Sequence, residues 1–156
     1  MCTWHACFPQ IPRVSGCSIT PVTHSQSARA LRVLVYSDDA QTRAQVIGAI
    51  GSRPDPRIPP VSYIEVATAP MVFAQLDAGV VDAVIADGEA TPAGGMGLAK
   101  QMKDELDPAP PVLVLLGRAD DRWLADWSRA DAVAVLPVDP IALPRAFVDM
   151  IGNAEL

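Results

Sequence analysis

Acidic side chains follow two apolar runs of this 156-residue chain, at the points where those runs end. Asp38 follows the run 31–36. Asp87 and Glu89 follow the run 82–86. Short carboxylates at the turn between a strand and a helix can cap free backbone amides, or they can take part in the chemistry of a bound ligand. Their negative charge repels phosphate, which disfavours a flavin-binding site at the first of these turns.

Other catalytic and phosphate-binding patterns are missing from the apolar part of the chain. Both histidines, His5 and His24, lie in the first 28 residues, so neither is expected near the acids as a general base. The stretch 94–97 lacks the Lys-Ser/Thr pair of a phosphate-binding loop and the glycine spacing of a dinucleotide-binding turn. The sequence therefore predicts a protein that is not an enzyme.

The elements that must position the acids alternate between strand-like and helix-like segments. Strands are expected at 31–36, 61–66, 82–86, 111–116 and 132–136, and helices at 40–50, 70–79, 96–106, 121–129 and from 140 onward. This alternation predicts an α/β fold, a doubly wound five-stranded parallel sheet with the flavodoxin-like strand order 2-1-3-4-5. Ligands of such sheets gather outside the carboxyl ends of the strands, so we expect the acids at the functional edge.

The last helix is expected to begin at a capped turn. Asp139 is the expected N-cap, and Pro140 is the expected first helical residue. Leu143, Phe147 and Ile151 then recur at helical spacing. These three side chains should form the stripe that packs the helix against the sheet.

The composition fits one folded domain and excludes several classes of protein. Half of the residues are apolar, which is too many for a disordered chain. The 18 acidic and 12 basic residues give a net charge of −6, so a nucleic-acid surface is not expected. No apolar run approaches the roughly 18 residues of a membrane-spanning helix, so no integral membrane segment is expected.

The first 28 residues differ from the rest of the chain. They show neither the period of a strand nor that of a helix, so we predict a disordered tail over 1–28 ahead of a folded domain over 29–156. All three cysteines lie in this tail, which leaves the domain without disulfides and fits the reducing cytoplasm. A zinc site is the less favoured interpretation, because its four candidate ligands lack the paired spacing of zinc modules: Cys2, His5, Cys7 and Cys17.

The acids and prolines together resemble the receiver domain of response regulators over about residues 31–152. Asp38 follows the first strand in Tyr-Ser-Asp-Asp, Asp87 stands after the third strand, and Pro137 follows the fifth. Arg43 also fits the family's pattern. The resemblance implies the flavodoxin-like receiver fold and a two-component phosphorelay, in which a histidine kinase supplies the phosphoryl group. It also implies a cis peptide bond before Pro137.

In that family, the residue at the position of Asp87 accepts a phosphoryl group with the help of Mg²⁺. The resemblance implies that Asp38, Asp87 and the carbonyl of Glu89 would hold this cation. Two carboxylates and one carbonyl leave room for water ligands, which is usual for Mg²⁺. We therefore expect a weak Mg²⁺ site at these residues, with Asp87 as the phosphoacceptor if the site is active.

Four positions depart from the receiver pattern. Ser37 replaces the first acid of the pair, Leu116 the hydroxyl residue after the fourth strand, and Leu136 the lysine after the fifth. The aromatic switch position of the family carries Val133. Phosphoryl transfer depends on cations and donors that neutralise the moving group, and leucine supplies neither. The departures predict a degenerate receiver that acts by protein–protein interaction; the alternatives are a phosphorylatable receiver and a small-molecule-binding flavodoxin-like module.

Two tryptophans are the candidate partner-binding residues. Trp123 and Trp127 stand four residues apart in the expected helix 121–129, so both lie on one face. One of them, Trp123, is the candidate for a core position, whereas an exposed Trp127 would be a typical interface anchor. The alternative is that both indoles belong to the core.

A narrower resemblance indicates the partner. Val-Tyr-Ser-Asp and Asp-Gly-Glu-Ala are similar to strings in orphan single-domain receivers of high-GC Gram-positive bacteria, a group linked with the proton-pumping NADH:quinone oxidoreductase, respiratory complex I. Few residues follow Ile151, so a stand-alone receiver is expected. The resemblance implies a cytoplasmic accessory subunit on the peripheral arm of complex I, held at the inner face of the cell membrane only through that partner.

Overall fold

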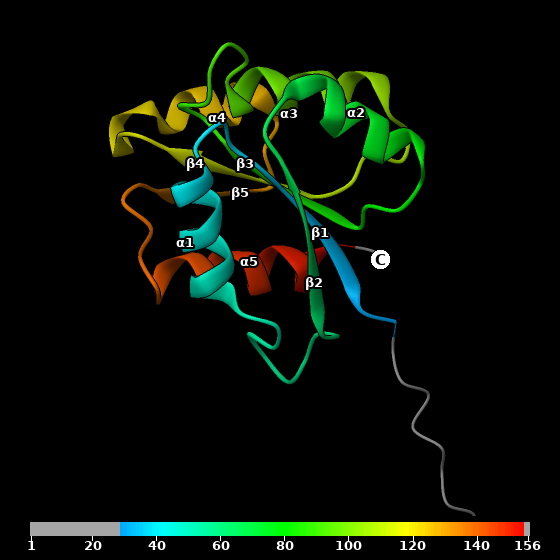
Figure 1. Ribbon diagram of the computed structural model, residues 1–156. Coiled ribbons are helices and arrows are strands. Elements are labelled where there is room, and N and C mark those ends of the chain that lie inside the picture. The colour runs from blue at the N-terminus through cyan, green and yellow to red at the C-terminus, as the bar shows by residue number, and fades with distance from the viewer. Residues whose placement is uncertain (1–28, 155–156) are drawn as a thin grey trace, which may run out of the picture.

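Five parallel strands form the centre of the computed structural model, which describes residues 29–154 (Figure 1). The strands are β1 (Leu31–Tyr36), β2 (Val61–Val66), β3 (Ala83–Asp87), β4 (Val112–Leu116) and β5 (Ala132–Val135). They lie in the order β2-β1-β3-β4-β5, which confirms the expected flavodoxin-like topology. The predicted tail, with its four candidate zinc ligands, lies outside the described residues.

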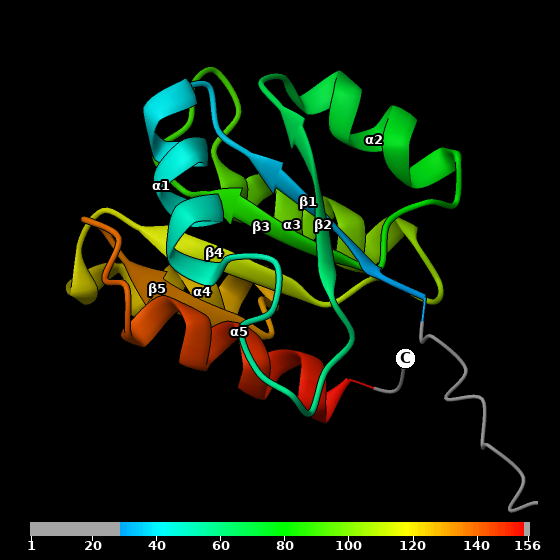
Figure 2. The same cartoon turned by 60° about the horizontal axis from the view of Figure 1, so that its bottom comes forward.

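Helices cover both faces of this sheet (Figure 2). They are α1 (Ala40–Ile50), α2 (Ala69–Asp77), α3 (Gly95–Glu105), the short 3-10 helix η1 (Ala119–Asp121), α4 (Arg122–Ser128) and α5 (Ala142–Asn153). α1 and α5 pack on one face, and α2, α3 and α4 pack on the other. None of the helices within residues 29–154 combines the length and the apolarity that a membrane span requires.

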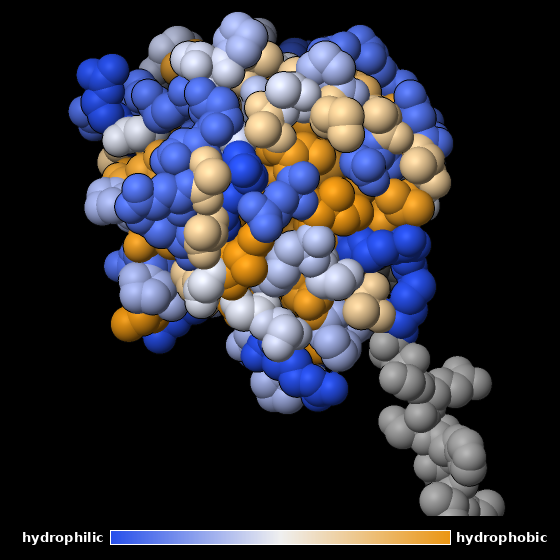
Figure 3. Space-filling view, viewed as in Figure 1, coloured by the Kyte–Doolittle hydropathy of each residue, from blue (hydrophilic) through white to orange (hydrophobic). Residues whose placement is uncertain are grey.

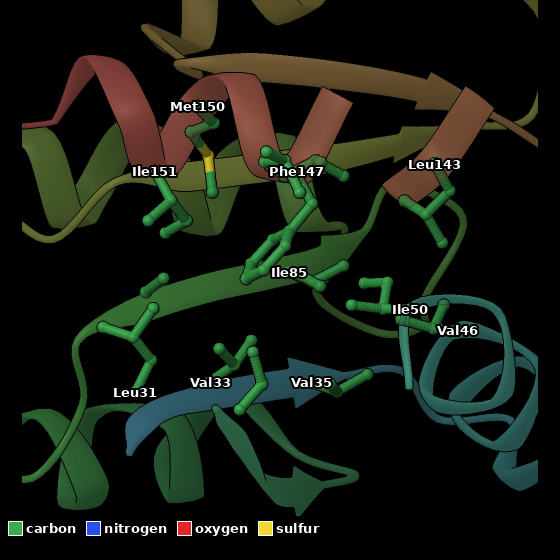
Figure 4. Packing of buried hydrophobic residues seen from close by; sticks show 14 of the residues in the cluster. Leu31, Val33, Val35, Val46, Ile50, Ile85, Leu143, Phe147, Met150 and Ile151 are labelled. Atoms are coloured by element: carbon green, nitrogen blue, oxygen red, sulfur yellow. The ribbon is translucent and has the colours of Figure 1, made fainter. Parts of the chain in front are cut away.

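The core under α5 joins this helix to the middle of the sheet. Phe147 is fully buried and points toward Ile85 of β3, with Val33 of β1 beyond it (Figure 4). Leu143 and Ile151 flank Phe147 on the same helix and are also buried, which confirms the expected core stripe. Every residue of β3 and β4 is buried, as expected for parallel strands with helices on both faces. The residues that follow β3 and β4 are therefore held in place by strands that are buried on both faces.

The last helix begins later than the sequence indicated. α5 starts at Ala142, two residues after Pro140. Asp139 still caps the turn before it, because its Oδ1 accepts from the amides of Ile141 and Ala142, at 2.7 and 2.8 Å. Residues 139–141 therefore form a capping turn, and the regular helix follows it.

Candidate functional site

The pairing of β1 with β3 brings Ser37 and Asp87 together at the carboxyl edge of the sheet. Tyr36, the last residue of β1, pairs with Ala86, so the residues that follow them are neighbours. The Ser37 hydroxyl donates a hydrogen bond to Asp87 Oδ2 at 2.7 Å. Both residues are buried, with exposed fractions of 1% and 4%. The Asp87 carboxylate is thus paired with a hydroxyl inside the protein.

Backbone amides complete the hydrogen bonding of this pair. The amide of Glu89 donates to Asp87 Oδ1 at 3.0 Å, and the amide of Asp39 donates to Ser37 Oγ at 3.1 Å. Each oxygen of the Asp87 carboxylate therefore has a protein donor. Burial of a carboxylate without donors is costly, so this network stabilises Asp87 where it lies.

Asp38 lies at the same edge in different surroundings. The residue is exposed, and its Oδ2 accepts a hydrogen bond from the Thr91 hydroxyl at 2.9 Å. This contact ties the turn after β1 to the loop after β3. Sequence reasoning missed Thr91, because a single threonine in a loop gives no sign of its distant partner.

Asp39 is a helix cap. Its carboxylate accepts from the amides of Gln41 and Thr42, at 2.9 and 3.3 Å, at the start of α1. The Gln41 amide and the Thr42 hydroxyl hold the pKa of Asp39 below its usual value. Arg43, one turn further along α1, donates to the Ser37 carbonyl at 2.6 Å and so fixes the turn that carries the site.

Glu89 covers the end of β4. Its side chain rests on Gly117, where a Cβ atom would lie 2.6 Å from Glu89 Cδ and Oε1. Gly88 is constrained as well, because a Cβ atom there would lie 2.5 Å from the Leu115 carbonyl oxygen. The two glycines allow the loop after β3 to lie directly on the end of β4. The Glu89 carboxylate adds a further acid to those at this edge.

The positions of the hydroxyl and the lysine in the receiver pattern are apolar here and belong to the core. Leu116 is fully buried on the face of α2, α3 and α4, and Leu136 is half-buried on the face of α5. The Leu136 amide donates to the Leu116 carbonyl at 2.7 Å. The peptide bond from Leu136 to Pro137 is cis, as the resemblance implied. Neither leucine side chain can donate a hydrogen bond or supply positive charge to a group on Asp87.

A tyrosine from the interior holds the loop after β3. Tyr36 is buried at the end of β1, and its hydroxyl donates to the Ala93 carbonyl at 2.6 Å. Burial, together with the charges of Asp38 and Asp87, raises the pKa of Tyr36, so the hydroxyl keeps its proton. The loop is therefore attached to the β1 region at two points, Ala93 and Thr91.

The residues at this edge fit a divalent cation only in part. Within residues 29–154 no group of three or more acidic, histidine or cysteine side chains is arranged to hold a metal ion. Asp38, Asp87 and the carbonyl of Glu89 are the groups that would hold Mg²⁺, with water completing an octahedral shell. The Ser37 hydroxyl directs its proton at Asp87, and a proton there competes with a cation for the same carboxylate.

Both tryptophans of α4 are exposed. The exposed fractions of Trp123 and Trp127 are 65% and 56%. The buried residues of α4 are Ala125 and Ser128, which lie on the opposite side of this short helix. The expectation that one indole reaches the core is therefore wrong, because the side chains that α4 buries are the small ones of Ala125 and Ser128. The role of the indoles in partner binding stays a prediction.

Comparison with known proteins gives relatives at the level of sequence. No family model matches the chain. Two curated proteins of Mycobacterium tuberculosis, from strains CDC 1551 / Oshkosh and ATCC 25618 / H37Rv, are each called an uncharacterized response regulatory protein. The chain is 58% identical to each over 125 residues, which cover 80% of this chain and 94% of the relative.

Solved structures share the fold at low sequence identity. The signal receiver domain of a signal transduction histidine kinase from Syntrophus aciditrophicus matches with a TM-score of 0.66 and 16% identity, over 81% of this chain and 93% of that one. A chemotaxis protein of Vibrio cholerae matches with a TM-score of 0.62 and 17% identity, over 78% of this chain and 98% of that one. The response regulator ChrA of a heme-sensing two-component system matches with a TM-score of 0.60 and 21% identity; the match covers 79% of this chain and 57% of ChrA.

Proposed function

The chain belongs to the response-regulator family and has the receiver fold, and from this premise we propose that it acts by binding another protein, without a phosphorylation switch at Asp87. The observation that carries the proposal is the buried Ser37–Asp87 pair. Asp87 accepts from the Ser37 hydroxyl at 2.7 Å and from the Glu89 amide at 3.0 Å, so protein donors already satisfy both of its oxygens. This arrangement supports a receiver whose acceptor position has become structural.

Charge around Asp87 supports the same proposal. A phosphoryl group on Asp87 would bring further negative charge to an edge that already carries Asp38 and Glu89. Leu116 and Leu136, in place of the hydroxyl and the lysine, provide neither a hydrogen-bond donor nor a cation. Stable phosphorylation is therefore disfavoured, since phosphoryl transfer depends on such groups.

The surface that we propose for partner binding is the exposed side of α4, defined by Trp123 and Trp127. Both indoles are more than half exposed in a chain with only 5% aromatic residues. Tryptophan is enriched among the residues that dominate interface energies, because its large ring loses much water-exposed area on binding. A binding site on α4 requires no chemistry at Asp87.

The test is recovery of the partner with variants of the full chain. Trp127→Ala should weaken binding at least about tenfold, and Asp87→Asn should leave it unchanged. Met71→Ala is the matched control, because Met71 is 49% exposed on α2, beside which Figure 3 shows a patch of apolar surface. Unchanged binding by Trp127→Ala, or loss of binding by Met71→Ala alone, would contradict the α4 surface.

As partner we propose the peripheral arm of respiratory complex I, which would hold the protein at the inner face of the cell membrane. The support is the resemblance of Val-Tyr-Ser-Asp and Asp-Gly-Glu-Ala to the orphan receivers linked with that complex. Affinity purification from native membranes, followed by mass spectrometry, should recover subunits of the NADH:quinone oxidoreductase. Recovery of other proteins without these subunits would contradict this choice of partner.

A second candidate function is a phosphorylatable signalling receiver served by a histidine kinase. The position of Asp87 at the carboxyl end of β3 favours it, because this is the acceptor position of the family. Acetyl phosphate with Mg²⁺ is the direct test, with Asp87→Asn as control and intact mass as readout. Stoichiometric labelling of Asp87 that changes partner affinity would establish this candidate and contradict the first.

A small-molecule-binding module has less support. Two surface hollows, of about 370 and 320 Å³, are lined by residues from the amino ends of the strands, such as Ala132 and Asp82. Ligands of doubly wound sheets bind at the opposite, carboxyl edge. Release of a chromophore or nucleotide from the purified protein would be the observation in favour of this function.

A further inference from the structure

A hydroxyl and a carboxylate lie side by side at the carboxyl ends of β1 and β3, where the receiver pattern has two carboxylates. We propose that Ser37 sets the metal affinity of this edge, because its hydroxyl proton takes the place of a cation beside Asp87 and keeps Mg²⁺ binding weak. The inference rests on the proposed function and adds to it the metal affinity of this edge of the sheet. It concerns only the chain's own residues.

The first argument is the direction of the Ser37 hydrogen bonds. The hydroxyl donates to Asp87 Oδ2 at 2.7 Å, while its oxygen accepts from the Asp39 amide at 3.1 Å. A cation bound between Ser37 and Asp87 would need the serine oxygen as a ligand, with the proton turned away from the carboxylate. Among the described residues, the neighbour on the other side is the Asp39 amide, which is a donor and cannot accept that proton.

The second argument is the burial of the pair. Ser37 and Asp87 are both almost fully buried, so a displaced hydroxyl proton would lose its acceptor without water to replace it. An unsatisfied buried donor is costly. A cation that takes the place of the hydroxyl proton at Asp87 Oδ2 must therefore break a good hydrogen bond before it gains that oxygen as a ligand.

The third argument is charge. A carboxylate at position 37 would add one more negative charge to the acids at this edge, which are Asp38, Asp39, Asp87 and Glu89. Carboxylate oxygens are preferred ligands of Mg²⁺, and a neutral hydroxyl attracts the cation less. Ser37 thus removes a charge from the donor set and adds a competing proton.

The test compares the full chain with Ser37→Asp and Ser37→Ala by calorimetric titration with MgCl₂ and by thermal melts with and without the cation. Ser37→Asp should bind Mg²⁺ at least about tenfold more tightly than the wild type, and Mg²⁺ should raise its melting temperature. Ser37→Ala removes the proton without adding a charge, so its affinity should rise less than that of Ser37→Asp. Adding Asp87→Asn to Ser37→Asp should abolish the gain.

Two outcomes would overturn the inference: a wild-type affinity equal to that of Ser37→Asp, or no gain in Ser37→Ala, which lacks the competing proton. If Ser37→Asp does not fold, Ser37→Ala still decides, because absence of any gain over the wild type contradicts a competing proton. Partner recovery is measured separately. Binding that depends on Trp127, with Mg²⁺ affinity unaffected by position 37, would overturn this inference and leave the proposed function standing.

Discussion

Arg129 ends α4 in a left-handed backbone conformation, with φ of 61°, while its guanidinium donates to the Asp104 carboxylate of α3 at 3.2 Å. A second bond of 3.2 Å runs from the same nitrogen to the carbonyl of Lys103. Among residues 29–154, Arg129 is the non-glycine residue with positive φ. The side chain thus joins the ends of two neighbouring helices from a backbone position that usually favours glycine.

Two substitutions of Arg129 distinguish the effect of its backbone conformation on stability from the effect of its side-chain contacts. Arg129→Gly and Arg129→Ala both lose the contacts with α3, but only glycine adopts this φ without strain. The free energy of unfolding of Arg129→Ala should therefore be about 1 kcal/mol lower than that of Arg129→Gly. Urea denaturation measures the difference, and equal stabilities would contradict strain at this position.

Core and surface aromatic residues should differ sharply in their effect on stability. Phe147→Ala removes a fully buried ring from the core under α5 and should cost about 3–5 kcal/mol. Trp127→Ala, on the exposed side of α4, should change the free energy of unfolding by no more than about 0.5 kcal/mol. Thermal and urea melts of the isolated protein check both values. A large loss in the tryptophan variant would place its ring in the core.

The cap at Asp39 makes stability depend on pH. Because hydrogen bonds lower the pKa of Asp39 in the folded state, its contribution is complete above the unfolded value of about 4 and is lost as pH falls through the lowered pKa. The melting temperature of the wild type should exceed that of Asp39→Ala at neutral pH, and the gap should close as the pH falls below the unfolded value of about 4. Asp38→Asn is the control, because Asp38 caps no helix. A gap that stays constant with pH would contradict an ionised cap.

Two glycines provide a matched test of the loop on β4. Gly88→Ala would put a Cβ atom 2.5 Å from the Leu115 carbonyl oxygen, a backbone atom inside the sheet, so the loop must shift. We expect a loss of roughly 1–3 kcal/mol. Gly48→Ala, in α1 with no atom within 4 Å of the new Cβ, should instead gain roughly 0.5–1 kcal/mol. Chemical denaturation of both variants gives the comparison, and a neutral Gly88→Ala would show that the loop moves freely.

Much of the fold could be predicted because its signals are local. The runs 112–116 and 83–86 are apolar throughout, which is typical of parallel strands covered on both faces, and the spacing of Leu143, Phe147 and Ile151 indicated the buried side of α5. The start of α5 was missed because an Asp-Pro pair is typical both of a helix start and of a separate capping turn. Helical spacing placed the two tryptophans on one face but could not tell which face packs on the sheet.

The site was less predictable, because its contacts join residues far apart in the sequence. The position of Asp87 followed from the end of an apolar run, whereas its bond to Ser37 depends on the register of β1 against β3. The bonds of Thr91 to Asp38 and of Tyr36 to Ala93 depend on the path of the loop after β3. No periodicity encodes that path, and a tyrosine inside an apolar strand looks like one more core residue.

The hydrogen bond from Tyr36 to Ala93 links the packing of the core to the position of a surface loop. The Tyr36 ring packs among aliphatic side chains between the sheet and its helices, while its hydroxyl holds a loop that runs outside the sheet edge. Substitutions that repack the neighbours of this ring would also displace the hydroxyl, and with it the outline of the loop. Substitutions around the Tyr36 ring are therefore constrained by the position of this loop as well as by stability.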